Sequence, residues 1–186
     1  MQRRVFLATL GAVPFALAVM FATRRTTAAA PPMSAAIEEI RANWRVLVPK
    51  GADVAVTTDA LARPNAEWKK TLAPQQYDVL REEGTERPFS SPLNGEKRAG
   101  VFVCAGCALP LFTSKMKFES GTGWPSFFTN IPGHVAMKKD FKIIMERDEY
   151  HCVRCGGHQG HLFDDGPPPT RQRWCNNGVA LRFIPA

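Results

Sequence analysis

FKIIMERDEYHCVRC, residues 141–155, sets the pattern for the second half of the chain, because it is a β-rich run that ends in a pair of cysteines. Two shorter runs have the same character, GVFVC at 100–104 and VALRFI at 179–184. The first, third and fifth residues of VALRFI are apolar and alternate along the chain, as the buried face of a strand does. Turn-rich clusters such as PFSSPLNG and NIPGH separate the runs. The sequence therefore predicts a mainly β, mostly antiparallel domain from about residue 88 onward.

Helices are expected only before this β domain. Apolar residues recur at spacings of three and four within residues 34–48, which predicts a short amphipathic helix with Ser34 as its cap. A second helix is predicted over 74–83, because proline suits its first turn and Gly84 suits its end. The stretch between them, residues 49–64, has no strong period and is expected to be a connector.

Four of the five cysteines form two CxxC pairs that are separated by 44 residues: Cys104 with Cys107, and Cys152 with Cys155. Two such turns can close one tetrahedral Zn²⁺ site, in which each two-residue spacer directs both sulfurs at the same point. Four thiolates leave no open position on the metal, so the zinc would be structural and would not activate water. Two disulfides are the alternative in an oxidising compartment.

The charge of the chain does not favour a nucleic-acid partner. The formal net charge is +7, but four arginines lie in the first 30 residues, which contain no acidic residue and no lysine. Subtracting these four charges leaves +3, a weak electrostatic footprint for a nucleic-acid-binding protein. The apolar share of 45% and the charged share of 22% are typical of a globular protein.

The N-terminus, residues 1–30, predicts export. A twin arginine precedes the mainly apolar run of residues 5–22, and small residues follow at 28–30. This pattern is typical of a twin-arginine signal, which carries already folded proteins and is compatible with zinc loading in the cytoplasm. The folded part is expected in the bacterial periplasm. The alternative is that the segment stays attached as an anchor in the inner membrane.

Cys175, the fifth cysteine, lies in RQRWCNNG, residues 171–178. If this stretch is extended, Arg173, Cys175 and Asn177 share one face. A guanidinium beside a thiol stabilises the thiolate and lowers the pKa of the thiol, which predicts a nucleophilic sulfur. The alternative is a buried, inert cysteine.

Two further clusters carry polar and aromatic residues. CGGHQGHLFDDG, residues 155–166, contains His158 and His161, and its glycines predict a turn that brings both rings toward one site. Histidines are suitable proton donors near neutral pH. Zinc ligands or ordinary surface histidines are the alternatives. FESGTGWPSF, residues 118–127, predicts a rigid loop that presents Trp124 to a methyl group on sulfur; alternatively, this ring belongs to the core.

At these residues the chain resembles the B-type methionine sulfoxide reductases, the peptide-methionine (R)-S-oxide reductases. The resemblance covers residues 65–186 and leaves 1–30 as the export segment and 31–64 as a linker. The motifs that carry it, in the order of the family, are EWKKTLAPQQYDVLREEGTERPF, both CxxC pairs, SGTGWPSF, GGHQGHLFDDG and RWCNNGVALRF.

The resemblance implies two antiparallel β-sheets with short helices and a Cys₄ zinc site remote from the chemistry. It also assigns roles to individual residues. Cys175 matches the nucleophile, and Trp124 matches the ring that receives the S-methyl group of the substrate. The polar active-site residues are matched by His158, His161, Arg173 and Asn177, and Phe163 completes an apolar wall.

The mechanism implied by this resemblance is an attack of the Cys175 thiolate on the sulfur of methionine (R)-sulfoxide. A histidine, by family analogy His161, donates a proton to the departing oxygen, and Cys175 becomes a sulfenic acid. Many family members have a second, resolving cysteine where this chain has Thr122. We therefore expect an external thiol to reduce Cys175, either a thioredoxin-like protein or a small thiol.

A second interpretation is a zinc-stabilised binding module of the same fold without turnover, although it leaves Cys175 and the two histidines without a role. A zinc hydrolase is disfavoured because four thiolates would occupy the metal. For the reductase we expect a monomer that acts on oxidised proteins or peptides containing methionine sulfoxide. It would contact a membrane only through its N-terminal segment.

Overall fold

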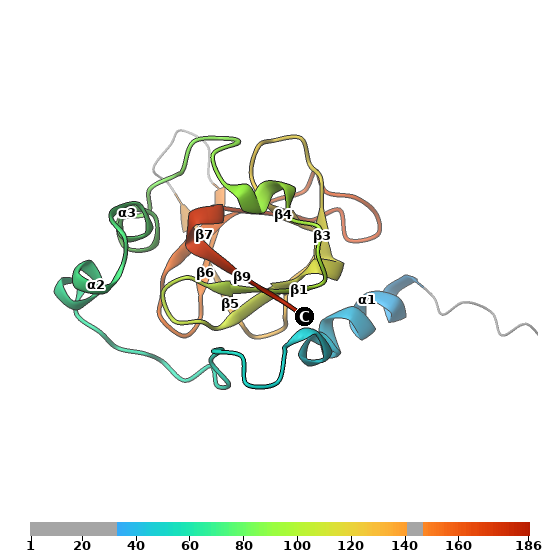
Figure 1. Ribbon diagram of the computed structural model, residues 1–186. Coiled ribbons are helices and arrows are strands. Elements are labelled where there is room, and N and C mark those ends of the chain that lie inside the picture. Colours follow the sequence, from blue (N-terminus) through green and yellow to red (C-terminus); the bar gives the residue numbers. More distant parts are fainter. Residues whose placement is uncertain (1–32, 141–146) are drawn as a thin grey trace, which may run out of the picture. The chain divides into compact units, whose positions relative to one another are not determined.

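The computed structural model describes residues 33–140 and 147–186, in which helices precede two β-sheets (Figure 1). The predicted export segment lies outside the described residues. Within the described ranges, no helix combines the length and the apolar character needed to span a membrane. The α-helices are α1 (Met33–Ala42), α2 (Asn65–Thr71) and α3 (Pro74–Glu82), and the 3₁₀ helices are η1 (Trp44–Leu47), η2 (Pro92–Gly95), η3 (Ser114–Met116) and η4 (Gly178–Ala180).

Two antiparallel sheets form the body of the domain, as predicted. The smaller sheet has the order β2-β1-β9 and the larger sheet the order β3-β4-β8-β7-β6-β5, with antiparallel pairing throughout. Of the run 141–155, residues 147–152 form a strand, while 141–146 lie outside the described residues. The strands are β1 (Gly100–Cys104), β2 (Pro110–Thr113), β3 (Lys117–Phe118), β4 (Ser126–Phe127), β5 (Val135–Asp140), β6 (Arg147–Cys152), β7 (His158–Phe163), β8 (Arg173–Asn176) and β9 (Leu181–Pro185).

Aromatic side chains from both sheets fill the space between them. Phe112 of the smaller sheet stacks on Phe127 of the larger one, with ring centroids 4.0 Å apart. Phe102 packs edge-on against the same Phe127 ring, and Tyr150 packs edge-on against Trp174. Such pairs stabilise a core beyond the area that they bury, by about 0.5–1.5 kcal/mol each. The aromatic core therefore fixes the larger sheet, which carries most of the candidate site, against the smaller one.

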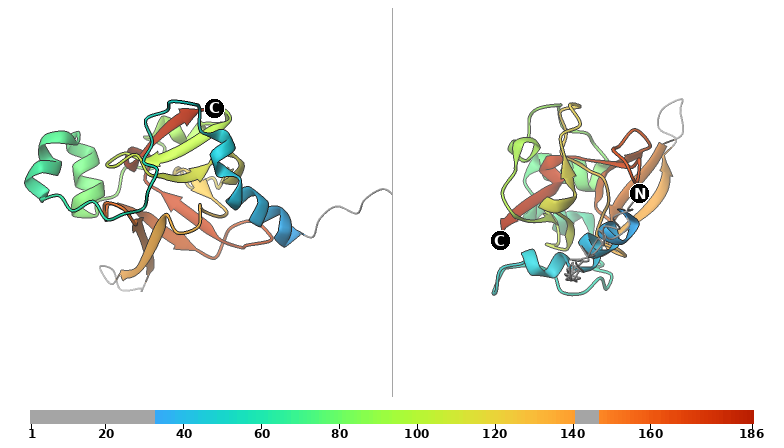
Figure 2. Two further views of the ribbon diagram at one scale, coloured as in Figure 1. Left: turned by 90° about the horizontal axis from the view of Figure 1, so that it is seen from below. Right: turned by 90° about the vertical axis from the view of Figure 1, so that its right-hand side faces the viewer.

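Helices α2 and α3 lie side by side at one end of the sheets (Figures 1 and 2). The sequence analysis missed α2, whose Trp68 is buried in the core cluster. It placed α3 correctly, but the left-handed residue that ends this helix is Glu83 (φ 58°) and Gly84 follows it. A Cβ at residue 84 would meet the side-chain carboxylate of Asp78, which would have to move.

The N-terminal helix is shorter than predicted. It begins at Met33, so Ser34 is not its cap, and it ends at Ala42; the 3₁₀ helix η1 follows. Trp44 of η1 is buried and packs edge-on against His134. The connector has no regular structure beyond residue 51, as expected, but Ala55 N–H donates to Ala108 O and Leu61 N–H donates to Arg154 O. Residues 33–64 therefore pack on the domain.

Strand β7 contains an irregularity that decides where its side chains point. Tyr150 of β6 pairs with Gly160, but the next β6 residue, His151, pairs with His158, so Gln159 has no partner in the ladder. An unpaired extra residue is a β-bulge, which shifts the side-chain alternation by one position. The two histidines that the sequence analysis expected on a glycine-shaped turn are thus in a strand, and the bulge is what brings their rings to one side.

The close approach of β7 to β8 at Gly160 can be tested by a substitution. A Cβ at this position would fall on the carbonyl oxygen of Cys175 in β8. We predict that Gly160→Ala lowers the free energy of unfolding by about 3 kcal/mol or more, because backbone must move to relieve the overlap. Urea unfolding followed by circular dichroism measures this change. Gly95→Ala is the matched control, since its Cβ would meet open space, and it should change stability by less than about 0.5 kcal/mol.

Candidate active site and zinc centre

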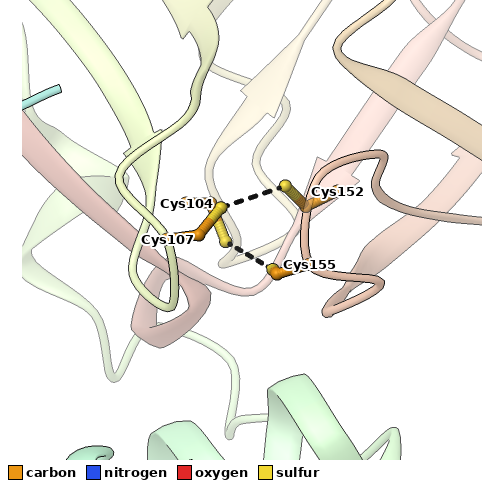
Figure 3. Close-up of side chains that lie close together, drawn as sticks. All are labelled: Cys104, Cys107, Cys152 and Cys155. Carbon is orange, nitrogen blue, oxygen red and sulfur yellow. Dashed lines mark hydrogen bonds between the residues drawn. The ribbon is translucent and has the colours of Figure 1, made fainter. Parts of the chain in front are cut away.

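The four paired cysteines converge on one point between two turns (Figure 3). Cys104 ends β1 and Cys107 lies in the turn that follows it, while Cys152 ends β6 and Cys155 lies in the turn that follows that strand. All four Sγ atoms lie within 4.8 Å of one another. The Cys104 and Cys155 sulfurs are 3.6 Å apart, and those of Cys107 and Cys152 are 3.5 Å apart.

This spacing fits a tetrahedral metal centre. Zinc–sulfur bonds of about 2.3 Å place the sulfurs of a tetrahedron about 3.8 Å apart, whereas a disulfide requires about 2.0 Å. Thiol–thiol hydrogen bonds and then burial raise the pKa of Cys104 well above its usual range, so a cation is needed to hold the whole set as thiolates. The four-cysteine cluster is therefore consistent with a zinc site. Gln159, fully buried at the bulge, donates from Nε2 to Cys104 Sγ.

Cys175 lies on β8, between two strands of the larger sheet. In the sheet, Cys175 pairs with Ser126 on β4 on one side and with His161 on β7 on the other. The thiol is partly exposed, and Arg173 and Thr122 lower its pKa, as predicted for the arginine. Burial is the larger effect, however, and the net pKa is raised above that of an ordinary thiol. The expectation of a lowered pKa is thus wrong, because the pocket removes water from the sulfur.

Arg173 is held by two partners besides the cysteine. It is 7% exposed, and its Nε and Nη2 donate to the two carboxylate oxygens of Asp165 at 2.7 and 2.9 Å. The guanidinium carbon also lies 4.2 Å from the centroid of the Phe163 ring. The bidentate pair holds the pKa of Asp165 below its usual value. Arg173 is therefore a fixed cation beside Cys175.

A pocket of about 120 Å³ opens over Cys175. Trp124 and Phe163, both predicted as substrate-contacting residues, lie in its wall, and Trp124 Nε1 donates to the carbonyl of Glu86. The sequence analysis gave no role to four of the lining residues, although each lies in a stretch that it quoted; they are Thr85, Arg147, Gly160 and Asn176. The full lining is Thr85, Trp124, Arg147, Gly160, His161, Phe163, Cys175, Asn176 and Asn177.

The two predicted histidines occupy different depths. His161 lines the pocket, whereas His158 is 2% exposed and does not line it. Their ring centroids are 5.4 Å apart, and His158 Nδ1 lies 2.9 Å from Glu149 Oε1. Burial lowers the pKa of both rings below the usual value. Only His161 is therefore placed to exchange a proton with a molecule in the pocket.

A sequence model of the SelR domain matches residues 72–185. The chain belongs to the SelR domain family. A protein of Methanosarcina barkeri named peptide methionine sulfoxide reductase MsrB is 53% identical over 125 residues, which are 67% of this chain and 88% of that protein. A protein of the same name from Agrobacterium fabrum is 46% identical over 131 residues, which are 70% of this chain and 97% of that protein.

In this SelR domain, Asn177 borders the pocket but its side chain is held by the protein. Its Oδ1 accepts from Glu86 N–H at 3.0 Å, and its Nδ2 donates to the carbonyl of Gln159 at 3.0 Å. Asn177 N–H donates to that same carbonyl. These bonds fix the chain just after Cys175. A direct contact of Asn177 with substrate stays a prediction.

Glu86 is a buried carboxylate of the SelR domain that the sequence analysis did not single out. Its two oxygens accept from the N–H groups of Gly178 and Val179 at 2.6 and 2.8 Å. Burial raises the pKa of Glu86, while these two bonds lower it. The bonds hold residues 178–180 as η4, which is why β9 begins at Leu181 and not at Val179 as predicted.

Removing the Glu86 carboxylate should destabilise the SelR domain. We predict that Glu86→Ala lowers the free energy of unfolding by about 2–4 kcal/mol, because two backbone N–H groups lose their partners and a cavity remains. Urea unfolding measures the change. Glu67→Ala, which removes an exposed partner of Lys70, is the control and should cost less than about 0.5 kcal/mol. Equal effects of the two variants would contradict this role.

The zinc assignment predicts one zinc ion per chain by elemental analysis of the purified protein. Cys107→Ser should lose the metal and several kcal/mol of stability, because metal binding to this site is coupled to folding. At about 2–4 °C per kcal/mol, Tm should fall by about 10 °C or more. Cys175→Ser is the control and should keep both the zinc and the Tm of the unmodified chain. A Cys107→Ser protein with unchanged metal content would contradict the assignment.

Proposed function

We propose that this protein reduces methionine sulfoxide in proteins and peptides to methionine, with Cys175 as the nucleophile. One observation carries the proposal. Cys175 is the cysteine that the four-thiol cluster leaves out, and it opens on a pocket opposite His161 in a chain of the SelR domain family. The relatives named peptide methionine sulfoxide reductase support the same reaction.

The chemistry balances with the groups at hand. The Cys175 thiolate attacks the sulfoxide sulfur and forms a sulfur–sulfur bond, while protonated His161 supplies a proton to the oxygen. With a second proton, the sulfur–oxygen bond breaks and the oxygen leaves as water. A water molecule then attacks Cys175 Sγ, the sulfur–sulfur bond breaks, methionine leaves in reduced form and one proton is released, so that Cys175 becomes a sulfenic acid and is oxidised by two electrons. Two thiols of an external reductant then return Cys175 to the thiol, form one disulfide and release water.

The walls of the pocket provide an apolar side for the S-methyl group of the substrate and a polar side for its sulfoxide oxygen. The rings of Trp124 and Phe163 provide apolar faces for the S-methyl group. The polar oxygen would lie toward His161, on the side where a proton is available. A pocket with one apolar and one proton-donating side can distinguish the two configurations at the sulfur, which supports our proposal that the R form is the substrate.

Regeneration is proposed to require an external thiol. The chain has five cysteines, and four of them form the cluster. At the position of the resolving cysteine, Thr122 hydrogen-bonds to Ser120 at 2.8 Å, and Ser120 hydrogen-bonds to Ser126 at 2.7 Å. Hydroxyls cannot form a disulfide with Cys175, so we propose a thioredoxin-like protein or a small thiol as the reductant.

Zinc is proposed to be structural. The four cysteines would hold it and leave no position for water or substrate, so its contribution would be to tie the turn after β1 to the turn after β6. We further propose that residues 1–30 direct export to the periplasm, with 31–64 as a segment that precedes the reductase domain of residues 65–186. The twin-arginine pattern of the sequence supports this location.

The direct test uses the full-length protein, dithiothreitol and the two diastereomers of methionine sulfoxide in separate reactions. We predict methionine from the R form only. Cys175→Ser should reduce the rate by at least about 1,000-fold, because the nucleophile is lost. The variant must keep its zinc and its circular dichroism spectrum. Absence of turnover with either form by the folded, zinc-containing protein would favour the binding-module interpretation.

A further inference from the structure

His161 contacts a buried carboxylate, that of Asp140. Asp140, the last residue of β5, is 6% exposed, and its Oδ2 lies 2.8 Å from His161 Nε2. Arg147 Nη2 lies 2.6 Å from the same oxygen and also lines the pocket. Charge-assisted hydrogen bonds of this length are about twice as strong as neutral ones. These hydrogen bonds therefore fix the position of Asp140 relative to the imidazole ring of His161.

The residue that bonds to this carboxylate is also the cross-strand neighbour of the thiol. His161 and Cys175 are direct cross-strand partners in the β7–β8 pair, and both line the pocket. Side chains at such positions have Cβ atoms about 4.5–5.5 Å apart. Because Nε2 is engaged with Asp140, the ring has only Nδ1 left to exchange a proton in the pocket. In the order of the strands across the larger sheet, the thiol is on β8, the imidazole on β7 and the carboxylate on β5.

We propose that Asp140 is a positioning residue for the proposed reduction: it accepts the Nε2–H of His161, fixes the tautomer and orientation of the ring, and leaves Nδ1 to give its proton to the sulfoxide oxygen. The inference rests on the proposed function for its chemistry, but its geometry is independent of the substrate. A carboxylate that orients a histidine beside a nucleophile is a recurrent catalytic arrangement. The hydrogen bond from Arg147 holds the carboxylate in place.

The charged groups around His161 determine in which direction its pKa changes when Asp140 is replaced. Burial lowers the pKa of the ring most, the hydrogen bond to Asp140 raises it, and Arg147 and His158 lower it. Loss of the Asp140 charge therefore lowers this pKa further. Within residues 33–140 and 147–186, the titratable groups that face the ring are Asp140 on β5, Arg147 and Glu149 on β6, His158 on β7 and Cys175 on β8.

The reaction needs Cys175 as thiolate and His161 as imidazolium. Burial raises the pKa of Cys175 and lowers that of His161, so the acid limb of kcat/KM against pH follows the histidine and the basic limb follows the thiol. Between the limbs kcat/KM is constant, and its value is set by the small fraction of protein that has both the thiolate and the imidazolium. This fraction falls as the two pKa values move apart. A lower pKa of His161 therefore moves the acid limb to lower pH and lowers the plateau, by about tenfold for each pH unit of movement.

The test is Asp140→Asn in the full-length chain, which keeps the shape of the side chain and removes its charge. We expect the acid limb to move to lower pH and the plateau to fall by about tenfold for each pH unit of that movement. The basic limb should stay in place. Asp148→Asn, which removes a half-exposed partner of Lys139, is the matched control and should keep the profile of the unmodified chain. A plateau that falls while the acid limb stays fixed would overturn the proposal.

A second readout needs neither turnover nor a substitution at Asp140. ¹⁵N NMR of the unmodified protein, with His161 assigned by its loss in His161→Gln, reports the tautomer of the neutral ring. We expect the proton on Nε2, and a proton on Nδ1 would overturn the proposal. If the Nε2–H tautomer is found in a protein that reduces neither sulfoxide form, the proposed function fails while the positioning by Asp140 stands.

Discussion

One unpaired residue in a strand, Gln159, links the metal centre to the pocket. Its side chain donates to Cys104 at the four-thiol cluster, and its carbonyl accepts two hydrogen bonds from Asn177. The residue is fully buried, so neither link is exchanged for water. The bulge that Gln159 creates also sets the alternation of β7, which turns His161 toward the pocket. The cysteine cluster is thereby coupled to the position of the site without taking part in the chemistry.

The pocket is built around two pairs of a guanidinium and a carboxylate. Arg173 with Asp165 lies beside Cys175, and Arg147 with Asp140 lies beside His161. Burial disfavours the thiolate form of Cys175 and the imidazolium form of His161, and each pair places charges close to one of these two groups. Arg173 and Asp140 are the buried members of these pairs, and each is held by a more exposed partner. The thiol and the imidazole therefore keep fixed charged neighbours.

The sequence indicated the β domain, the cysteine cluster and the residues around Cys175, because each has a local signature in spacing or composition. It could not indicate what depends on distant contacts. The bulge at Gln159 follows from pairing with β6, and the roles of Glu86 and Asp140 follow from partners 92 and 21 residues away. The raised pKa of Cys175 was predicted with the wrong sign, because the neighbouring arginine is visible in the sequence and the burial is not.

The most direct measurement of the central claim is mass spectrometry of the protein after a single turnover with methionine (R)-sulfoxide and no reductant. The account predicts one methionine formed per chain and one oxygen gained on Cys175, trapped by dimedone, with the four cluster cysteines unchanged. A disulfide from Cys175 to one of those cysteines would contradict the one-cysteine cycle. Methionine formed while Cys175 remains a free thiol would contradict its assignment as the nucleophile.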